Sequence, residues 1–192
     1  AQALATARVS LWLFEPGQTA IVCSLLYEDG KGLSKPGTRI AAEVAPVYFQ
    51  SLQGLLTLAA EDAHNDPRTR EFEQSYLDPL GIGAMLDVPV RLFGEMVGLL
   101  CHEHVSGPRH WSDAERIFAA AMGVLCSQTM EFEKLQKAER EREQALFYDP
   151  LTGLANRALF LDRLGQALKG EGAALLVLDI EGFSELIEAY GT

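Results

Sequence analysis

Two carboxylates near the C-terminal end of the chain have the spacing of a cation site. Asp179 and Glu181 lie at the end of the apolar run "AALLVLDIEGF". Such a run suits a strand that is buried on both faces, and side chains two residues apart on a strand point to the same face. Open α/β sheets bind ligands at the carboxyl ends of their strands, and Mg²⁺ takes oxygen ligands. The pair is therefore a candidate Mg²⁺ site.

A second candidate for metal binding is "CHEH". His102 and His104 are two apart in a predicted strand, so they face the same side, and two imidazoles can bind a metal. No third ligand is evident, because Cys101 points to the opposite face. We therefore expect the two histidines to be hydrogen-bonded, or partly exposed at the strand end, rather than to hold a metal.

Composition narrows the class of protein. The 192 residues are 48% apolar and 22% charged, which is enough for a packed core. The net charge of -11 opposes binding to nucleic acid or to an anionic membrane. The sequence has no signal peptide at its start and no apolar run of roughly 20 residues, so we expect no membrane span. Cys23, Cys101 and Cys126 lack CxxC spacing, which predicts reduced, buried thiols in a cytoplasmic protein.

The elements that position these residues come from periodicity and turn signals. Phe72, Tyr76 and Leu80 are four apart and predict an amphipathic helix that Pro79 and Gly81 end. The full set comprises strands at 8–14, 19–27, 54–62, 83–92 and 95–105, and helices at 44–52 and 69–82. The last two strands are separated by Phe93-Gly94, which predicts a hairpin.

A long helix follows the hairpin. Ser112 and Glu115 form a capping-box pattern, and the helical period continues for about 35 residues. The first half of the helix is apolar and the second half is highly charged. Its apolar seam comprises Leu125, Phe132, Leu135 and Leu146. Glu139 and Arg142 interrupt this seam, so it predicts only a weak coiled coil.

The segment "YDPLTGLANR" joins this helix to a new pattern. Pro150 disfavours helical backbone at Asp149 and so stops the long helix. Thr152-Gly153 predicts a turn, and Asn156 is a candidate N-cap for a second helix. Phe160, Leu164 and Leu168, four apart, predict the buried stripe of that helix.

The first part of the chain resembles a GAF domain, a sensory relative of the PAS fold. The resemblance rests on "RVSLWLF", "YLDPLGIGAMLDVPVRLFGEMVGLLCHEHV" and "RHWSDAERIFAAAMGVL", and it covers residues 1–130. It implies an α+β fold, with a PAS-like antiparallel sheet flanked by helices, followed here by the long connecting helix. GAF domains usually begin with a helix, whereas this chain opens with "AQALATA", so we expect a truncated N-terminus.

The GAF resemblance also implies a small-molecule site between the sheet and the covering segments 44–52 and 69–82. The candidate lining residues are Trp12, Tyr48, Phe49, Tyr76, Met85 and Asp87. An ordinary packed core is the alternative for most of these residue types. Neither the cyclic-nucleotide signature nor a bilin-attachment cysteine in its usual context is present, so the ligand is unknown.

The last part of the chain resembles the start of a GGDEF domain, the diguanylate cyclase family. The match to the opening motif D-x-L-T-G-L-P-N-R is made by Asp149, Leu151, Thr152, Gly153, Asn156 and Arg157. Ala155 replaces the proline. "LDIEGFSELIEAYGT" is similar to the next block of the family. We therefore expect a truncated α/β GGDEF fragment whose first motif transmits a signal and whose signature loop lies beyond Thr192.

The GGDEF resemblance implies that Asp179, Glu181 and the carbonyl of Ile180 bind Mg²⁺ in the complete parent protein. Two departures weaken the match to GTP. Ser184 replaces a lysine near the phosphates, and Ile187 replaces the asparagine that recognises guanine. Isoleucine neither donates nor accepts a hydrogen bond, so the resemblance supports metal binding more than GTP specificity.

The sequence thus predicts a GAF sensor domain at 1–130, a helical signalling linker at 131–148 and a GGDEF fragment at 149–192. We expect a cytoplasmic homodimer, formed through the 112–147 helix, in bacterial cyclic-di-GMP signalling. The complete parent protein would condense two GTP molecules, whereas this chain is too short to be catalytic. The alternative is a non-catalytic ligand-binding and dimerisation module whose degenerate GGDEF domain regulates another effector domain.

Overall fold

The computed structural model describes residues 1–170, 174–178 and 181–182. The chain divides into two units, residues 1–135 and 136–192, and the longest helix contributes residues to both. No helix in the described ranges has the length and apolarity needed to cross a bilayer.

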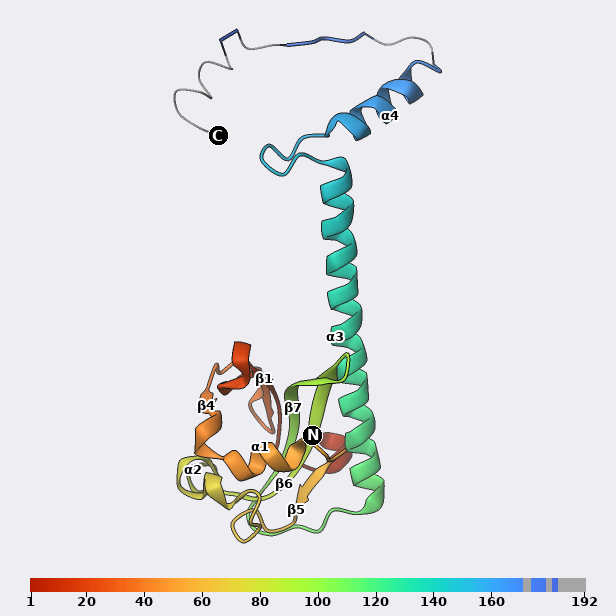
Figure 1. The fold of residues 1–192 in the computed structure, drawn as a ribbon. Coiled ribbons are helices and arrows are strands. Elements are labelled where there is room, and N and C mark those ends of the chain that lie inside the picture. The colour runs from red at the N-terminus through yellow and green to blue at the C-terminus, as the bar shows by residue number, and fades with distance from the viewer. Residues whose placement is uncertain (171–173, 179–180, 183–192) are drawn as a thin grey trace. The chain divides into compact units, whose positions relative to one another are not determined.

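One antiparallel sheet dominates the first unit (Figure 1). Its strand order is β3-β2-β1-β7-β6-β5, and β4 also pairs with β2. The strands are β1 (Arg8–Phe14), β2 (Ala20–Glu28), β3 (Gly32–Ser34), β4 (Arg39–Ala41), β5 (Leu58–Ala60), β6 (Ile82–Leu92) and β7 (Glu95–Val105). The predicted hairpin is confirmed, with Phe93 and Gly94 at its turn, whereas the strand predicted at 54–62 is only three residues long.

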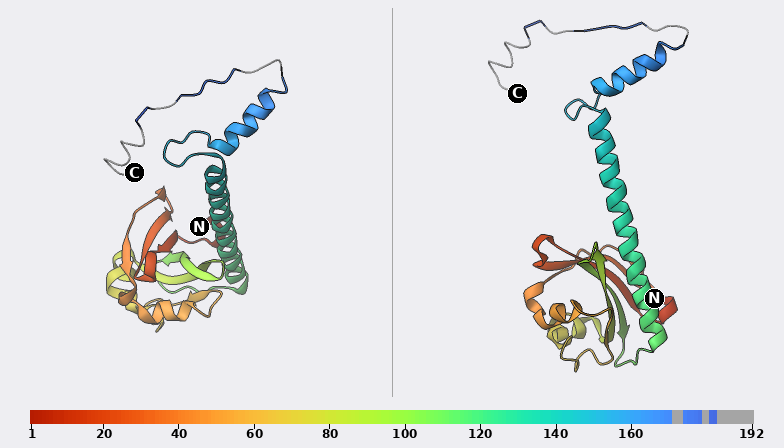
Figure 2. Two further views of the ribbon diagram at one scale, coloured as in Figure 1. Left: turned by 45° about the horizontal axis from the view of Figure 1, so that its top comes forward. Right: turned by 45° about the vertical axis from the view of Figure 1, so that its right-hand side comes forward.

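Helices cover both faces of this sheet (Figure 2). The inner face is covered by α1 (Pro46–Leu52), by the 3-10 turn η4 (Arg70–Phe72), by the π turn η5 (Glu73–Leu77) and by α2 (Asp78–Leu80). The outer face is covered by the first part of α3 (Asp113–Phe147) and by the short N-terminal turn η1 (Gln2–Leu4). Two further 3-10 turns, η2 (Pro16–Gln18) and η3 (Ala42–Val44), connect strands and helices.

The segment 70–80 differs from the single α-helix that its spacing predicts. It passes from 3-10 to π to α geometry within eleven residues. Pro79 has no N–H to donate to the preceding turn, which interrupts a regular α ladder. Gly81, with φ of 64°, then ends the segment as predicted.

The helix α3 is continuous over 35 residues, as predicted. Its capping box is formed: the Ser112 amide donates to Glu115 Oε2 at 2.9 Å and the Glu115 amide donates to Ser112 Oγ at 3.3 Å. The helix packs closely on β6 at Gly123, where an added Cβ would lie 2.3 Å from Val88 Cγ1. Gly123 is therefore needed for the close approach of helix and sheet.

The second unit contains the end of α3, the joint and α4 (Arg157–Ala167). The buried stripe predicted for α4 is wrong: Phe160 and Leu168 are exposed, because no described element covers them. The strand predicted at 173–183 is also not formed in its described core, since residues 174–178 belong to no strand and are exposed. A strand needs neighbours to satisfy its backbone groups, and the described part of this unit offers none.

Replacing Gly123 with alanine should loosen the contact between α3 and β6. Alanine is the better helix former by about 1 kcal/mol, yet its Cβ meets Val88, and overpacking of this kind costs about 1–3 kcal/mol. We expect a net loss in the free energy of unfolding, measured by urea titration of tryptophan fluorescence. Gly54→Ala is the control, because an added Cβ there meets nothing within 4 Å. A Gly123→Ala variant as stable as the wild type would contradict the close packing.

Candidate functional site

A small cavity lies on the inner face of the sheet. Its volume is about 20 Å³, which is room for about one water molecule. The lining residues are Trp12, Ile21, Ile40, Tyr48, Phe72, Tyr76, Met85, Cys101 and Glu103. The aromatic rings pack edge to face, with centroids 5.8 Å apart for Trp12 and Tyr76 and 4.9 Å apart for Tyr48 and Phe72.

Glu103 is a fully buried acid at this cavity. Its carboxylate accepts a hydrogen bond from Arg8 Nε at 2.8 Å and one from the Tyr76 hydroxyl at 2.6 Å. Arg8 also forms an ion pair with Glu28. A buried charge is tolerated only when it is paired and hydrogen-bonded, so these contacts tie β7 to β1 and to η5.

Asp87 is a second fully buried acid, on the neighbouring strand β6. The Tyr48 hydroxyl donates to its Oδ2 at 2.6 Å, whereas Oδ1 has no hydrogen-bond partner among the described residues. Burial, with a smaller contribution from the charge of Glu103, raises the pKa of Asp87 to about 7, while the hydrogen bond from Tyr48 opposes the shift. Asp87 can therefore gain or lose a proton near neutral pH.

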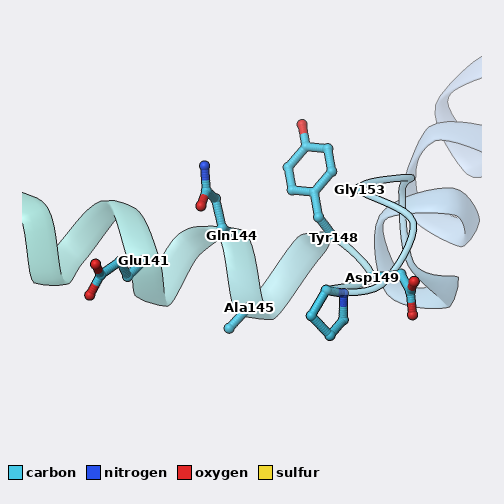
Figure 3. Close-up of a pocket in the computed structure, with 7 residues that line it drawn as sticks. Glu141, Gln144, Ala145, Tyr148, Asp149 and Gly153 are labelled. Carbon is cyan, nitrogen blue, oxygen red and sulfur yellow. The ribbon is translucent and has the colours of Figure 1, made fainter.

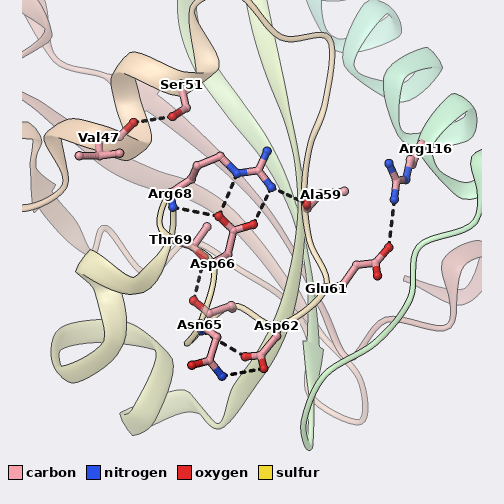
Figure 4. Close-up of polar contacts among 11 residues, drawn as sticks. Val47, Ser51, Ala59, Glu61, Asp62, Asn65, Asp66, Arg68, Thr69 and Arg116 are labelled. Atoms are coloured by element: carbon pink, nitrogen blue, oxygen red, sulfur yellow. Dashed lines mark hydrogen bonds and ion pairs between the residues drawn. The ribbon is translucent and has the colours of Figure 1, made fainter.

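The covering segments are held to each other and to the sheet by polar contacts. Glu71 Oε2, in η4, accepts from the amides of Val47 and Tyr48 at 3.0 and 3.2 Å, at the start of α1. Figure 4 shows the loop after β5, where Arg68 donates to Asp66 and to the Ala59 carbonyl. A displacement of Tyr48 would therefore alter the contacts of η4 as well as those of α1.

The predicted lining residues are only partly brought together. Trp12, Tyr48, Tyr76 and Met85 line the cavity. Phe49 packs beside the core cluster, and Asp87 does not line the cavity but is hydrogen-bonded to Tyr48, which does. Whether any of these residues binds a ligand stays a prediction.

Sequence reasoning missed Glu103 and Arg8. Side chains alternate between the two faces of β7, so Glu103 lies on the same face as Cys101. The alternation that places His102 and His104 on one face therefore also places Glu103 on the inner face. The residue of β6 opposite Glu103 could not be predicted by counting residue pairs outward from the hairpin turn. A register shift between Val90 and Arg91 pairs Met85 with Glu103, and such a bulge offsets every pair beyond it.

The histidines of "CHEH" lie on the other face. His102 is buried and its Nδ1 lies 2.9 Å from the Leu86 carbonyl, which confirms the expected hydrogen bond. Burial lowers the pKa of His102. Cys23 and Cys101 are buried and unbridged, as predicted, whereas Cys126 is half-buried.

The predicted Mg²⁺ ligands lie at the edge of what the structure describes. Asp179 and Ile180 fall outside the described residues, and Glu181 is exposed. In the described ranges, no group of three or more His, Cys, Asp or Glu side chains could hold a metal.

The joint after α3 is a compact hydrogen-bonded turn. Asp149 Oδ1 accepts from the Thr152 hydroxyl at 2.7 Å and from its amide at 2.8 Å, and these bonds lower the pKa of Asp149. Gly153 has φ of 69°, a left-handed conformation that favours glycine. Leu151 and Arg157 are exposed. An open groove of about 640 Å³ lies beside this turn, and it is lined by Glu141, Gln144, Ala145, Tyr148, Asp149, Pro150 and Gly153. Figure 3 draws these side chains.

Asn156 connects the two helices of the joint. Its Nδ2 donates to the Leu146 carbonyl in the last turn of α3 at 2.8 Å, and its Oδ1 accepts from the Leu159 amide in the first turn of α4 at 3.1 Å. The Asn156 amide also donates to the Phe147 carbonyl at 2.9 Å. One side chain therefore caps the end of one helix and the start of the next, which confirms and extends its predicted N-cap role.

Comparison with family models decides the identity of the first unit. The model described as "GAF domain" matches residues 1–130. The chain belongs to the GAF domain family. A second model, described as "Diguanylate cyclase, GGDEF domain", matches residues 146–192, so the resemblance of the joint and the following residues to the start of a GGDEF domain is confirmed as well.

Solved structures agree with the GAF fold. The GAF domain of Thermosynechococcus elongatus PixJ, described as a blue-light absorbing form, is 18% identical with a TM-score of 0.57, covering 73% of this chain and 85% of that chain. The GAF domain of a two-component sensor histidine kinase from Bacillus halodurans is 21% identical with a TM-score of 0.54, covering 71% and 89%. At these identities the likeness concerns the fold alone. The search of curated proteins found no match.

The buried carboxyl of Asp87 should make the stability of the GAF domain depend on pH. Its pKa is raised from 3.8 to about 7 on folding, so the stabilising effect of its proton is complete below about pH 4 and is lost as the pH rises through 7. Between pH 5 and 8 the free energy of unfolding of the wild type should fall by about 3 kcal/mol relative to Asp87→Asn, since one pKa unit corresponds to about 1.4 kcal/mol.

Urea unfolding at several pH values, followed by tryptophan fluorescence, measures this difference. Glu95→Gln, a change at an exposed acid on β7, is the control and should keep the wild-type pH dependence. Parallel curves for the wild type and Asp87→Asn would show that Asp87 does not titrate in this range.

Replacing Asn156 with alanine should uncouple the two helices of the joint. The change removes both side-chain hydrogen bonds, and loss of an N-cap costs about 1 kcal/mol. We expect faster amide hydrogen exchange at Leu159 and a smaller helical circular dichroism signal. Gln144→Ala, at an exposed position of α3, should leave both unchanged. Unaltered exchange at Leu159 in the Asn156 variant would contradict the bridging role.

Proposed function

We propose that the GAF domain is a sensory module that regulates a diguanylate cyclase-like GGDEF domain in bacterial cyclic-di-GMP signalling. The observation that supports this most directly is the single helix α3. It begins on the outer face of the GAF sheet, runs without a break to Phe147, and ends where the match to the GGDEF domain begins.

The contacts of α3 with the hairpin give the pocket a connection to the helix. Ser127 Oγ accepts from the Arg91 amide at 3.0 Å, and Glu131 Oε1 accepts from the Phe93 amide at 2.6 Å. Gly123 lies against Val88, the neighbour of Asp87. The strands that carry the two buried acids therefore also contact α3, so a change in the cavity can bias the position of the helix.

The apolar seam of α3 is exposed, which favours a homodimer. Its apolar members Leu125, Phe132 and Leu135 are between 51% and 61% exposed, although side chains of this size are usually buried. Their spacing places them on one face of the helix. We propose that α3 pairs with α3 of a second copy, and that Glu139 and Arg142 keep the pairing weak toward the joint.

In the complete parent protein, the proposed output is the condensation of two GTP molecules, for which Asp179, Glu181 and the Ile180 carbonyl would hold Mg²⁺. These residues supply only oxygen ligands, which suits Mg²⁺. The proposed location is the cytoplasm, which the buried, unbridged thiols of Cys23 and Cys101 support.

A non-catalytic role is the second candidate. It is favoured by Ser184 and Ile187, which stand where the GGDEF family has the lysine near the phosphates and the asparagine that recognises guanine. In that case the GGDEF part binds nucleotide weakly or mediates dimerisation, and it regulates another effector domain.

The dimer is tested by a Leu125→Glu, Phe132→Glu double variant. Carboxylates placed in an apolar seam would lose hydration on pairing, so the variant should become monomeric in sedimentation velocity at tens of micromolar. The control, Lys137→Gln with Gln144→Glu, changes the net charge by the same amount as the seam variant. Its substitutions lie away from the apolar seam, so it should stay dimeric. A monomeric wild type, or a folded seam variant that remains fully dimeric, would overturn the proposed role of α3.

A further inference from the structure

The two buried acids of the inner face differ in what surrounds them. Glu103 forms an ion pair with Arg8 and also accepts a hydrogen bond from the Tyr76 hydroxyl. Asp87, equally buried, accepts from the uncharged Tyr48 hydroxyl at its Oδ2, while in the described part of the chain its Oδ1 has no partner and no basic side chain pairs with it. A buried charge without a counter-charge is costly, so these surroundings favour the neutral, protonated form of Asp87.

The groups that face Asp87 come from α1, β5 and β7. Tyr48 faces it from α1, Cys101 lies directly opposite on β7, and Glu103 follows two residues further along that strand. Leu58, its neighbour on β5, carries no ionisable group. Burial raises the pKa of the Tyr48 hydroxyl and of the Cys101 thiol well above their usual values, so both stay neutral, and Glu103 is already ion-paired. Asp87, with a pKa of about 7, is the member of this set that can change its charge near neutral pH.

We propose that Asp87 is a proton switch that controls how firmly α1 covers the inner face of the sheet. With the proton bound, Asp87 and Tyr48 form a neutral hydrogen-bonded pair that holds α1 against β6. When the proton leaves to solvent, the electron pair of the O–H bond stays on the carboxyl oxygen and α1 opens more readily. The proposal rests on the sensory function proposed above and names the sensed signal, the proton.

The carboxylate of Asp87 cannot be hydrated while α1 is in place. Asp87 has no exposed surface, and it does not line the inner-face cavity, which has room for about one water. Water therefore reaches the carboxylate only when Tyr48 and α1 move away from β6. Because desolvation disfavours the charged form of a carboxyl group, loss of the proton makes the open arrangement more favourable relative to the closed one.

The position of Asp87 connects this switch to both faces of the sheet. On the inner face, Tyr48 ties α1 to Asp87, and the Tyr48 amide is also bound by Glu71 of η4. On the outer face, Val88, the next residue of β6, lies against Gly123 of α3. Opening of α1 removes packing from the inner side of the strand on which α3 packs. The state of the cover therefore bears on the helix that leads to the GGDEF part.

Amide hydrogen exchange on the full chain tests the switch. Exchange of the α1 amides is measured at pH 6 and pH 8, corrected for the intrinsic pH dependence of exchange, and compared with exchange of the β1 amides. A carboxyl group open to water has a pKa of about 4, against about 7 for Asp87 in the closed state. The open form of α1 should therefore rise about tenfold from pH 6 to pH 8 and level off above about pH 7. At both pH values α1 should exchange faster than β1, because local opening requires less free energy than global unfolding.

Variants then assign the response to Asp87. Asp87→Asn keeps this position neutral, so its corrected α1 exchange should be the same at pH 6 and pH 8. Tyr48→Phe removes the hydroxyl that donates to the carboxylate, and this hydrogen bond opposes the raised pKa of Asp87. In that variant the rise should continue above pH 7 instead of levelling off. Glu95→Gln, a change at an exposed acid of β7, should follow the wild type.

Corrected α1 exchange that is independent of pH in the wild type, or that keeps its pH dependence in Asp87→Asn, would overturn the proposal. Exchange of α1 as slow as that of β1 would do the same, because the cover would then open only on global unfolding. If Asp87→Asn does not fold, a Tyr48→Phe profile that levels off where the wild type does decides against the switch. Sedimentation at pH 6 tests the α3 dimer separately. A dimer without a working switch therefore rejects the proton as the signal and leaves the proposed regulatory function standing.

Discussion

Two fully buried carboxylates, Asp87 and Glu103, constrain everything that packs over the inner face of the GAF sheet. A buried charge requires hydrogen-bonding partners, and each partner here comes from a different element. Tyr48 comes from α1, Tyr76 from η5 and Arg8 from β1. The acids therefore fix both covering segments against the hairpin, and whatever changes their charge also changes how firmly the cover is held.

Features that depend on neighbouring residues were predictable from the sequence. The hairpin turn at Phe93-Gly94, the capping box of Ser112 and Glu115, and the N-cap at Asn156 each use groups within a few positions of one another. Such interactions form in nearly any context, because the chain itself brings the groups together. The second bond of Asn156, to the Leu146 carbonyl, spans ten residues and was not predicted, because it requires the path of the whole turn.

The candidate site depended on tertiary information, which is why only part of it was predicted. A register shift at Val90 and Arg91 decides which residue of β7 faces Met85, and no turn rule reveals it. Apolar periodicity failed where the described part of the chain provides no covering element: Phe160 and Leu168 have helical spacing but are exposed, and residues 174–178 have strand-like composition without a strand. Periodicity reports which face could be buried, whereas burial itself requires another element to cover that face.

The hairpin of β6 and β7 contacts the cavity with its inner face and α3 with its outer face. Alternation puts Asp87 on the inner face and Val88, which contacts Gly123, on the outer face, while the turn donates its amides to Ser127 and Glu131. A shift of this hairpin cannot alter one face and spare the other, because the core is close-packed. Coupling between two sites is reciprocal. If occupancy of the cavity changes the pairing of α3, dimerisation must change the affinity of the cavity by the same factor.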